Sequence, residues 1–339
     1  MIARDARADV YQALNEILMR PKKKIVEEFG DYFFEYFRGM IFENPNANNG
    51  DVLGGYFSFQ QNLFELAQAR NKRVLEVGCG FGLTSICFYI LGAKEVVGID
   101  IDHNKIANFN KLVSFLKIEK EVRGELADAC MQSSDARVFD AVTCNEVISH
   151  VRDLDGFLDS TLRLLVPGGR IVIRDGNNAL NKAIVIDQQR IQHKSEYGPV
   201  DGTGLEKPYR QMRYDMIRDR FPQLEHSVAQ RLAENTKGLW GEQISEVVEK
   251  YFRTGNLNQV VEYQFRNPLT GEYQERLFDP LELAGRLRAI GFRSVRVHPI
   301  MPFGYSKIGR KAALKLIEPL NPLFFRIWKI GFEIEAAKI

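Results

Sequence analysis

The chain has 339 residues, of which 45% are hydrophobic and 27% are charged, and its formal net charge is +2. This ordinary globular composition gives no global signal for nucleic-acid binding. No stretch reaches the roughly 18 uninterrupted apolar residues of a membrane span, and the start lacks the apolar segment of a secretory signal. We therefore expect a cytoplasmic protein without a nucleic-acid partner, built as one large domain with insertions or as two domains.

Four cysteines occur, and none of them forms a C-x-x-C pair: Cys79, Cys87, Cys130 and Cys144. They fall in or beside predicted core elements, so we interpret them as reduced core thiols. No histidine, cysteine or carboxylate cluster has the spacing of metal ligands, so the sequence predicts no metal site.

Two helical stripes of apolar residues open the chain, at residues 4–20 and from Ile25 to about Phe42, with a break after Pro21. The second stripe is very aromatic. We expect residues 1–57 to form a helical cap on the domain edge, and a wall of the substrate pocket is the alternative. Ser58, three residues before Gln61, is then predicted to cap a helix that runs to Arg70.

The stretch from Arg73 to Asp102 organises the rest of the chain. A short apolar strand leads into the motif E-x-G-x-G-x-G, which consists of Glu76, Gly78, Gly80 and Gly82. A helix over 83–91 and a second strand over 95–99 follow, and this strand ends on Asp100. Glycines allow a sharp turn and close approach of a ligand, and the terminal acid can accept hydrogen bonds from ribose hydroxyls. This pattern predicts a nucleoside-binding, doubly wound α/β sheet.

The glycine spacing differs from the dinucleotide fingerprint G-x-G-x-x-G, because Leu83 stands one position after the third glycine. Together with Glu76 inside the strand and Asp100 after the next one, the motif resembles the class I S-adenosylmethionine-dependent methyltransferases. The sequence Leu-Val-Pro-Gly-Gly at 165–169, expected to end a helix before a fifth strand at 170–174, is also frequent in that family. The resemblance covers about residues 70–176 and implies a mostly parallel, seven-stranded, Rossmann-like sheet with S-adenosylmethionine as cofactor.

The resemblance also implies where the cofactor binds. Asp128, after a third strand at 122–127, matches the acidic position that meets the adenine amino group, although a surface-loop aspartate is the alternative. Asn145, after a fourth strand at 139–144, lies in the segment that lines the methionine side. The predicted cofactor-binding residues are Glu76, Gly78, Cys79, Gly80, Gly82, Asp100, Ile101, Asp128, Ala129 and Asn145.

Methyl transfer from a sulfonium is an in-line displacement, to which alignment alone can contribute about 7–11 kcal/mol. A hydroxyl acceptor would also need a general base. Glu146 and His150 are the candidates nearest the expected methyl position, and a helix-start residue without catalytic role is the alternative for His150. The predicted substrate-binding residues are Asp175, Asn177, Asn178 and His193.

About 100 residues separate the fifth strand from the next core helix, too many for a structureless loop in a compact domain. We expect an α+β insertion at 177–278 that acts as a lid or substrate subdomain, with a β-hairpin of 260–265 and 272–278. A decorative or oligomerising insertion is the alternative. Residues 58–176 would form the cofactor-binding core. Residues 279–339 would complete it, starting with a helix capped by Asp279.

Between two final strands, at 293–297 and 332–337, lies a basic and aromatic stretch, residues 305–330. It is either a packed helical excursion or an amphipathic segment on a membrane surface. Peripheral membrane contact and a homodimer are therefore open expectations.

The function expected from the resemblance is methyl transfer, to oxygen, of a small-molecule, natural-product or glycan acceptor. The alternatives are a lipid-linked or membrane-associated acceptor and a non-catalytic S-adenosylmethionine-binding protein. A nicotinamide-dependent oxidoreductase is disfavoured by the glycine spacing.

Overall fold

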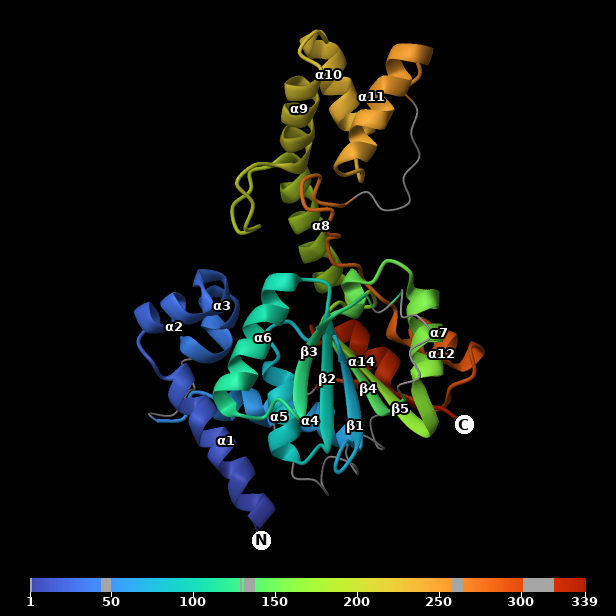
Figure 1. Ribbon diagram of the computed structural model, residues 1–339. Coiled ribbons are helices and arrows are strands. Elements are labelled where there is room, and N and C mark those ends of the chain that lie inside the picture. Colours follow the sequence, from blue (N-terminus) through green and yellow to red (C-terminus); the bar gives the residue numbers. More distant parts are fainter. Residues whose placement is uncertain (1, 44–49, 129, 131–137, 258–264, 301–319) are drawn as a thin grey trace. The chain divides into compact units, whose positions relative to one another are not determined.

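The computed structural model describes residues 2–43, 50–128, 130, 138–257, 265–300 and 320–339 (Figure 1). The chain forms two compact units. One, which we call the sheet unit, comprises Met1–Gly176 and Asp279–Ile339. The other, the helical unit, is Asn177–Phe278. Each unit is described by itself.

A seven-stranded sheet in the order β3-β2-β1-β4-β5-β7-β6 forms the centre of the sheet unit. β7 runs antiparallel to its neighbours β5 and β6, and the other pairs are parallel. The strands are β1 Arg73–Val77, β2 Glu95–Asp100, β3 Val122–Leu126, β4 Phe139–Asn145, β5 Leu165–Asp175, β6 Arg293–Pro299 and β7 Phe332–Ala337. Buried apolar residues on both faces explain the short apolar runs of the central strands. The predicted mostly parallel, seven-stranded sheet is confirmed.

Helices cover both faces of the sheet, with α4, α5 and α6 on one side and α7 and α12 on the other (Figure 1). The α-helices described in the sheet unit after the N-terminal cap are α4 Gly54–Leu66, α5 Leu83–Leu91, α6 His103–Leu116, α7 Leu154–Leu164, α12 Pro280–Ala289 and α14 Asn321–Ile327. The Asp102 carboxylate accepts hydrogen bonds from the backbone N–H groups of Asn104 and Lys105 and so caps α6. Asp279 caps α12 in the same way, as predicted.

Three predicted boundaries are wrong, and one of them is the end of α4, which stops at Leu66 and not at Arg70. Helix α4 begins at Gly54 and not at Ser58, because the Asp51 carboxylate accepts a hydrogen bond of 2.9 Å from the Gly54 N–H and starts the helix earlier. The strand β5 begins at Leu165, so the Pro-Gly-Gly sequence lies inside its irregular start rather than after α7. The register with β4 shifts there, between Phe139 and Ala141, as a bulge allows.

The N-terminal residues form α1 Ile2–Leu18, α2 Lys22–Phe29, α3 Asp31–Phe37 and the π-helix Arg38–Phe42. The single aromatic stripe expected after Pro21 is therefore divided at Gly30, where φ is +87°. The stripe packs on Phe81, a residue of the glycine turn that is 1% exposed. Phe33 and Tyr36 contact it with ring centroids 5.1 and 5.3 Å apart. The cap is thus joined to the predicted cofactor loop by aromatic edge-to-face contacts.

The helical unit consists of α8 Lys182–Tyr197, α9 Tyr209–Arg220, α10 His226–Asn235 and α11 Glu242–Thr254, with an apolar core of its own. The predicted hairpin is confirmed only next to its turn: one antiparallel bridge joins Arg266 to Tyr273, and the Gln274 N–H donates to the Phe265 carbonyl at 2.9 Å. The predicted strand 272–278 is wrong, because these residues form no continuous strand. The turn between Arg266 and Tyr273 is present, because the Asn267 N–H donates to the Glu272 carbonyl at 2.8 Å. Residues 260–264 of the other predicted strand lie outside the described residues.

Most of the predicted basic and aromatic stretch, residues 305–319, also lies outside the described residues. Over the described parts of the chain, no helix is both long and apolar enough to cross a membrane. Three cysteines are buried as predicted, but Cys130 is only half-buried, so it is not a core thiol.

Candidate cofactor and methyl-transfer site

The three motif glycines all have positive φ, but they serve different purposes. A Cβ on Gly78 would lie 2.2 Å from a methyl carbon of Val147, and one on Gly82 would lie 1.9 Å from the ring of Phe109. A Cβ on Gly80 would meet only the Tyr36 hydroxyl, at an ordinary contact distance of 3.7 Å. Gly78 and Gly82 are therefore required by packing, and Gly80 leaves room for a ligand at the backbone.

Asp100 fastens this turn to the end of β2. Its carboxylate accepts hydrogen bonds of 2.9 Å from the N–H groups of Gly80 and Asp102, one on each oxygen. A carboxylate has about four acceptor sites, so two remain for other donors. The structure thus places a fixed, partly exposed acceptor beside the open face of Gly80, as binding of a ribose requires.

Apolar side chains flank Asp100 at the carboxyl edge of the sheet. Ile101 is 76% exposed, and Leu126, the partner of Asp100 in the β3 register, is 56% exposed. Asp128 is exposed, and its carboxylate accepts a 2.8 Å hydrogen bond from the Cys130 N–H. This edge presents apolar surface and one oriented carboxylate, which suits an adenine ring. Ala129 lies outside the described residues.

Glu76 and Cys79 are buried beneath the turn, and their predicted contact with the cofactor stays a prediction. The Ser85 hydroxyl of α5 donates a hydrogen bond to the Glu76 carboxylate. Burial raises the pKa of Glu76 to about 8, although hydrogen bonds from Ser85 and Thr84 oppose the shift. The Cys79 N–H donates to the Ile99 carbonyl at 3.0 Å. Both residues therefore position the turn.

The loops after β4 and β5 are tied together by two carboxylates. Glu146 accepts a 3.0 Å hydrogen bond from the Gly176 N–H, and the fully buried Asp175 accepts a 3.2 Å bond from the Ser149 N–H. Glu146 has φ of +54°, a strained conformation for a non-glycine residue. His150 is exposed at the end of the short 3₁₀-helix Ile148–His150. Asp175 thus orders a loop, and its burial favours this role over the predicted contact with substrate.

The other predicted substrate-binding residues belong to the helical unit. The Asn177 amide donates to a Glu275 carboxylate oxygen at 3.0 Å. Asn178 is buried, and its side-chain oxygen accepts a 3.0 Å bond from the Leu180 N–H. His193 is exposed on α8. The two asparagines therefore order the start of the helical unit, and substrate binding by any of the three stays a prediction.

Sequence reasoning missed Tyr36 and Lys105. The hydroxyl of Tyr36 stands over Gly80, and the Lys105 ammonium lies 5.9 Å from the centre of its ring. Burial raises the pKa of Tyr36, and the charge of Lys105 opposes this shift. The aromatic stripe was visible in the sequence, but no local signal indicates that α3 reaches the glycine turn.

A buried acceptor completes the geometry. The side-chain oxygen Oδ1 of Asn145, at the end of β4, has no hydrogen-bond partner among the residues described. Since an unsatisfied buried acceptor costs free energy, it favours a bound donor such as an ammonium group.

The family model for a methyltransferase domain matches residues 56–235 of this chain.

The chain belongs to the methyltransferase-domain family.

Similar curated proteins include three ubiquinone biosynthesis O-methyltransferases. That of Xanthomonas oryzae pv. oryzae is 38% identical over 103 residues, which cover 30% of this chain and 41% of that protein. That of Paraburkholderia phymatum is 33% identical over 105 residues, covering 30% and 44%. That of Pseudomonas putida is 34% identical over 109 residues, covering 32% and 45%. The chain thus spans less than half the length of these relatives.

S-adenosylmethionine is the cofactor that these residues fit. Asp100 offers acceptors for two ribose hydroxyls, Gly80 leaves the backbone open, and the Asn145 oxygen can accept from the ammonium group of the methionine end. The predicted family and cofactor are confirmed.

Proposed function

We propose that this methyltransferase domain transfers a methyl group to an oxygen atom of a small-molecule acceptor. The observation that carries the proposal is the open face of Gly80 beside the fixed carboxylate of Asp100. The names of the similar proteins, which are O-methyltransferases, support oxygen as the acceptor atom. A natural product or a glycan would fit the same chemistry.

The bound cofactor supplies an electrophilic methyl group on a positively charged sulfur. The residues of the chain supply alignment and exclusion of water. Asp100 and Gly80 hold the nucleoside, Asp128 and Ile101 border the adenine, and Asn145 orients the methionine end. Tyr36 covers the turn from the cap, so that the cofactor approaches between α3 and the sheet edge.

His150 is the better candidate for a base that accepts the acceptor's proton. It is exposed at the carboxyl edge, whereas Glu146 is held by the Gly176 N–H and by a strained backbone. We assign Glu146 to positioning of the β4 and β5 loops. His150→Ala should lower kcat about 10²- to 10⁴-fold with little change in cofactor affinity, and an unchanged kcat would remove His150 from the mechanism.

The helical unit is proposed to close over the acceptor and set its specificity, with Asn177, Asn178 and His193 on the substrate side. It follows β5 directly, at the carboxyl edge where ligands of such sheets bind. A closing segment would keep water from the sulfonium. An assembly role, including a homodimer contact, is the competing proposal for this unit.

Calorimetry of the purified protein tests the proposal first. We expect micromolar binding of S-adenosylmethionine or its demethylated product and no measurable binding of NAD. Cell extracts are then screened by mass spectrometry for a labelled methyl group. Cofactor binding without any labelled product would favour the non-catalytic alternative, and a labelled lipid would favour the membrane-associated acceptor. The cytoplasmic location stays a prediction.

A further inference from the structure

A cavity of about 580 Å³ lies at the C-terminal end of α5, whereas the glycine turn lies at the N-terminal end of the same helix. Nine helical residues separate the two ends, which corresponds to roughly 13 Å along the axis. The cavity is lined by Arg7, Ala8, Tyr11, Gln12, Arg70, Ile90 and Leu91. It is therefore distinct from the methyl-transfer site.

Two guanidinium groups converge on this cavity. The Nη1 atoms of Arg7 and Arg70 each lie 3.0 Å from the point where a Cβ on Gly92 would stand, so the two groups are close together. Arg7 is held by a 2.9 Å hydrogen bond from Nη2 to the Ala93 carbonyl and by the ring of Tyr89. Arg70 lies over the ring of Phe64. Both cations are thus held in place before any ligand arrives.

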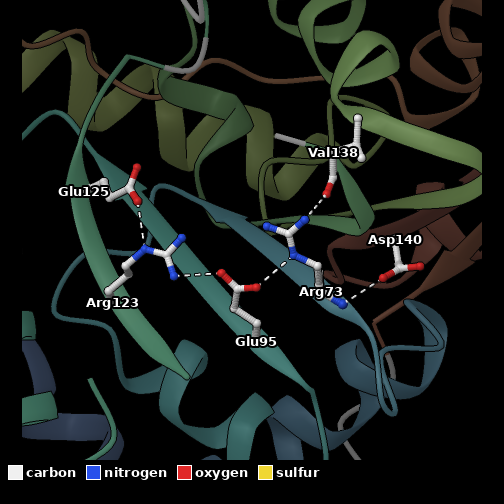
Figure 2. Close-up of polar contacts among 6 residues, drawn as sticks. All are labelled: Arg73, Glu95, Arg123, Glu125, Val138 and Asp140. Atoms are coloured by element: carbon white, nitrogen blue, oxygen red, sulfur yellow. Dashed lines mark hydrogen bonds and ion pairs between the residues drawn. The ribbon is translucent and has the colours of Figure 1, made fainter. Parts of the chain in front are cut away.

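Arg7 and Arg70 differ in their partners from Arg73 and Arg123 of the same unit. Figure 2 shows the ordinary arrangement, in which Arg73 and Arg123 share the carboxylate of Glu95. No carboxylate forms an ion pair with Arg7 or Arg70 among the side chains that the structure describes. The C-terminal end of α5 offers only the partial negative charge of its dipole. Two like charges held together in this way favour a bound anion.

The rest of the lining limits the kind of anion. Ala8, Ile90 and Leu91 present apolar surface beside the two cations. The Tyr11 hydroxyl already donates to the Asp51 carboxylate at 2.7 Å, so the tyrosine contributes mainly its ring. Guanidinium groups bind phosphate oxygens through paired N–H donors. The lining suits a phosphate attached to a small apolar group.

We propose that this cavity is a second ligand site, which takes a phosphate monoester with a small apolar body through Arg7 and Arg70. The apolar body would rest on Ile90 and Leu91. The source of the phosphate group is either a soluble metabolite or the headgroup of a lipid, and the chemistry of recognition is the same.

Calorimetry at low salt with phenyl phosphate tests the site, with the full chain saturated with S-adenosylmethionine. We expect saturable binding at millimolar or lower concentration, weaker binding of inorganic phosphate, and loss of binding at high salt. Arg7→Gln and Arg70→Gln should each weaken it about tenfold or more. Arg163→Gln, a matched change of an exposed arginine on α7, should leave it unchanged.

A cavity-filling variant distinguishes loss of the ligand site from misfolding of the protein. Ala8→Phe keeps both arginines and fills the apolar part, so it should abolish phenyl phosphate binding and spare binding of inorganic phosphate. Vesicles that contain a phosphomonoester lipid serve as the membrane arm, and pull-down of the protein only when Arg7 and Arg70 are intact would identify a headgroup. The proposal would be overturned if phenyl phosphate showed no saturable binding, or if both arginine variants bound it as tightly as the unchanged protein does. The arginines would then only cap α5.

Discussion

Each unit of the protein contains a fully buried arginine–glutamate pair, and the two pairs connect the chain differently. In the sheet unit, Arg174 of β5 bonds Glu333 of β7 through Nε at 2.9 Å and Nη2 at 2.6 Å. These residues are 159 positions apart. In the helical unit, Arg213 of α9 bonds Glu196 of α8, only 17 positions away, and its Nε donates to the Ala233 carbonyl of α10 at 2.7 Å.

The difference concerns which segments each pair joins. The Arg174–Glu333 pair connects the strand before the helical unit to the last strand of the chain, so the sheet unit is complete only when its C-terminus is in place. The Arg213–Glu196 pair joins helices within one continuous segment. Buried pairs cost desolvation and contribute little net stability, but an unpaired buried charge is strongly destabilising. We therefore expect the helical unit to fold and unfold independently of the sheet.

The largest expected effect follows from removal of the helical unit. Its ends meet, because the Phe278 N–H donates to the Asn177 carbonyl at 2.9 Å, so a short linker can replace residues 177–278. We expect turnover to be abolished and S-adenosylmethionine affinity to change less than about threefold, since the cofactor-binding residues belong to the sheet unit. Calorimetry measures the S-adenosylmethionine affinity, and a methyl-transfer assay measures turnover. Full turnover by the shortened protein would contradict the lid role and favour assembly.

Breaking the buried pairs separately sharpens the comparison. Arg213→Met and Arg174→Met should each lower stability by about 3–5 kcal/mol. Arg213→Met should speed hydrogen exchange in the helical unit alone, whereas Arg174→Met should affect the whole sheet. Arg190→Met, which removes an exposed pair on α8, is the control. Equal loss of protection in both units from either variant would show that they unfold together.

A pH effect is expected in the sheet unit. The pKa of Glu76 is raised to about 8, so the folded state holds a proton that the unfolded state has lost between about pH 4.5 and 8. Stability should fall as pH rises through this window. Glu76→Gln should remove this dependence, which amounts to roughly 5 kcal/mol over the whole window, and should leave the helical unit unaffected. Urea unfolding at pH 5.5 and 8.5 tests this, and identical pH slopes in both proteins would refute it.

Loss of a ribose contact should act on binding rather than folding. Asp100→Ala removes one or two charge-assisted hydrogen bonds and should weaken S-adenosylmethionine binding roughly ten- to a hundredfold. Asp159→Ala, on the exposed surface of α7, is a matched control. If calorimetry gives unchanged affinity for an intact Asp100→Ala protein, the assigned ribose position is wrong.

The smallest expected effect concerns the ion pairs across β1, β2 and β3, which join Arg73, Glu95, Arg123 and Glu125 (Figure 2). Burial alone would raise the pKa of Glu95, but the hydrogen bonds and charges of Arg123 and Arg73 lower it. The stabilisation from these ion pairs is present above the pKa of Glu95 in the unfolded chain. It is lost as the pH falls through the pKa of Glu95 in the folded protein. These side chains are partly exposed, so Glu95→Gln should cost only about 1 kcal/mol, and less at high salt. A loss that salt does not reduce would indicate a different cause.

Features set by neighbouring residues were determined by the sequence itself. The glycine turn, helix α5 and the Asp279 cap depend on contacts within a few positions, and all of them have the predicted places. The predicted family and sheet follow from the same stretch. Ser58 does not cap α4, because the carboxylate of Asp51, three residues before Gly54, accepts a hydrogen bond from the Gly54 N–H and starts the helix earlier.

Features made by distant segments were decided only by the tertiary structure. The contact of Tyr36 with the glycine turn and the Glu146–Gly176 bond join residues that have no local relation. The same holds for the convergence of Arg7 and Arg70 on Gly92 and for the Arg174–Glu333 pair. Local patterns indicate what each segment forms, but only packing decides which side chains meet, because burial selects among many pairings of similar free energy.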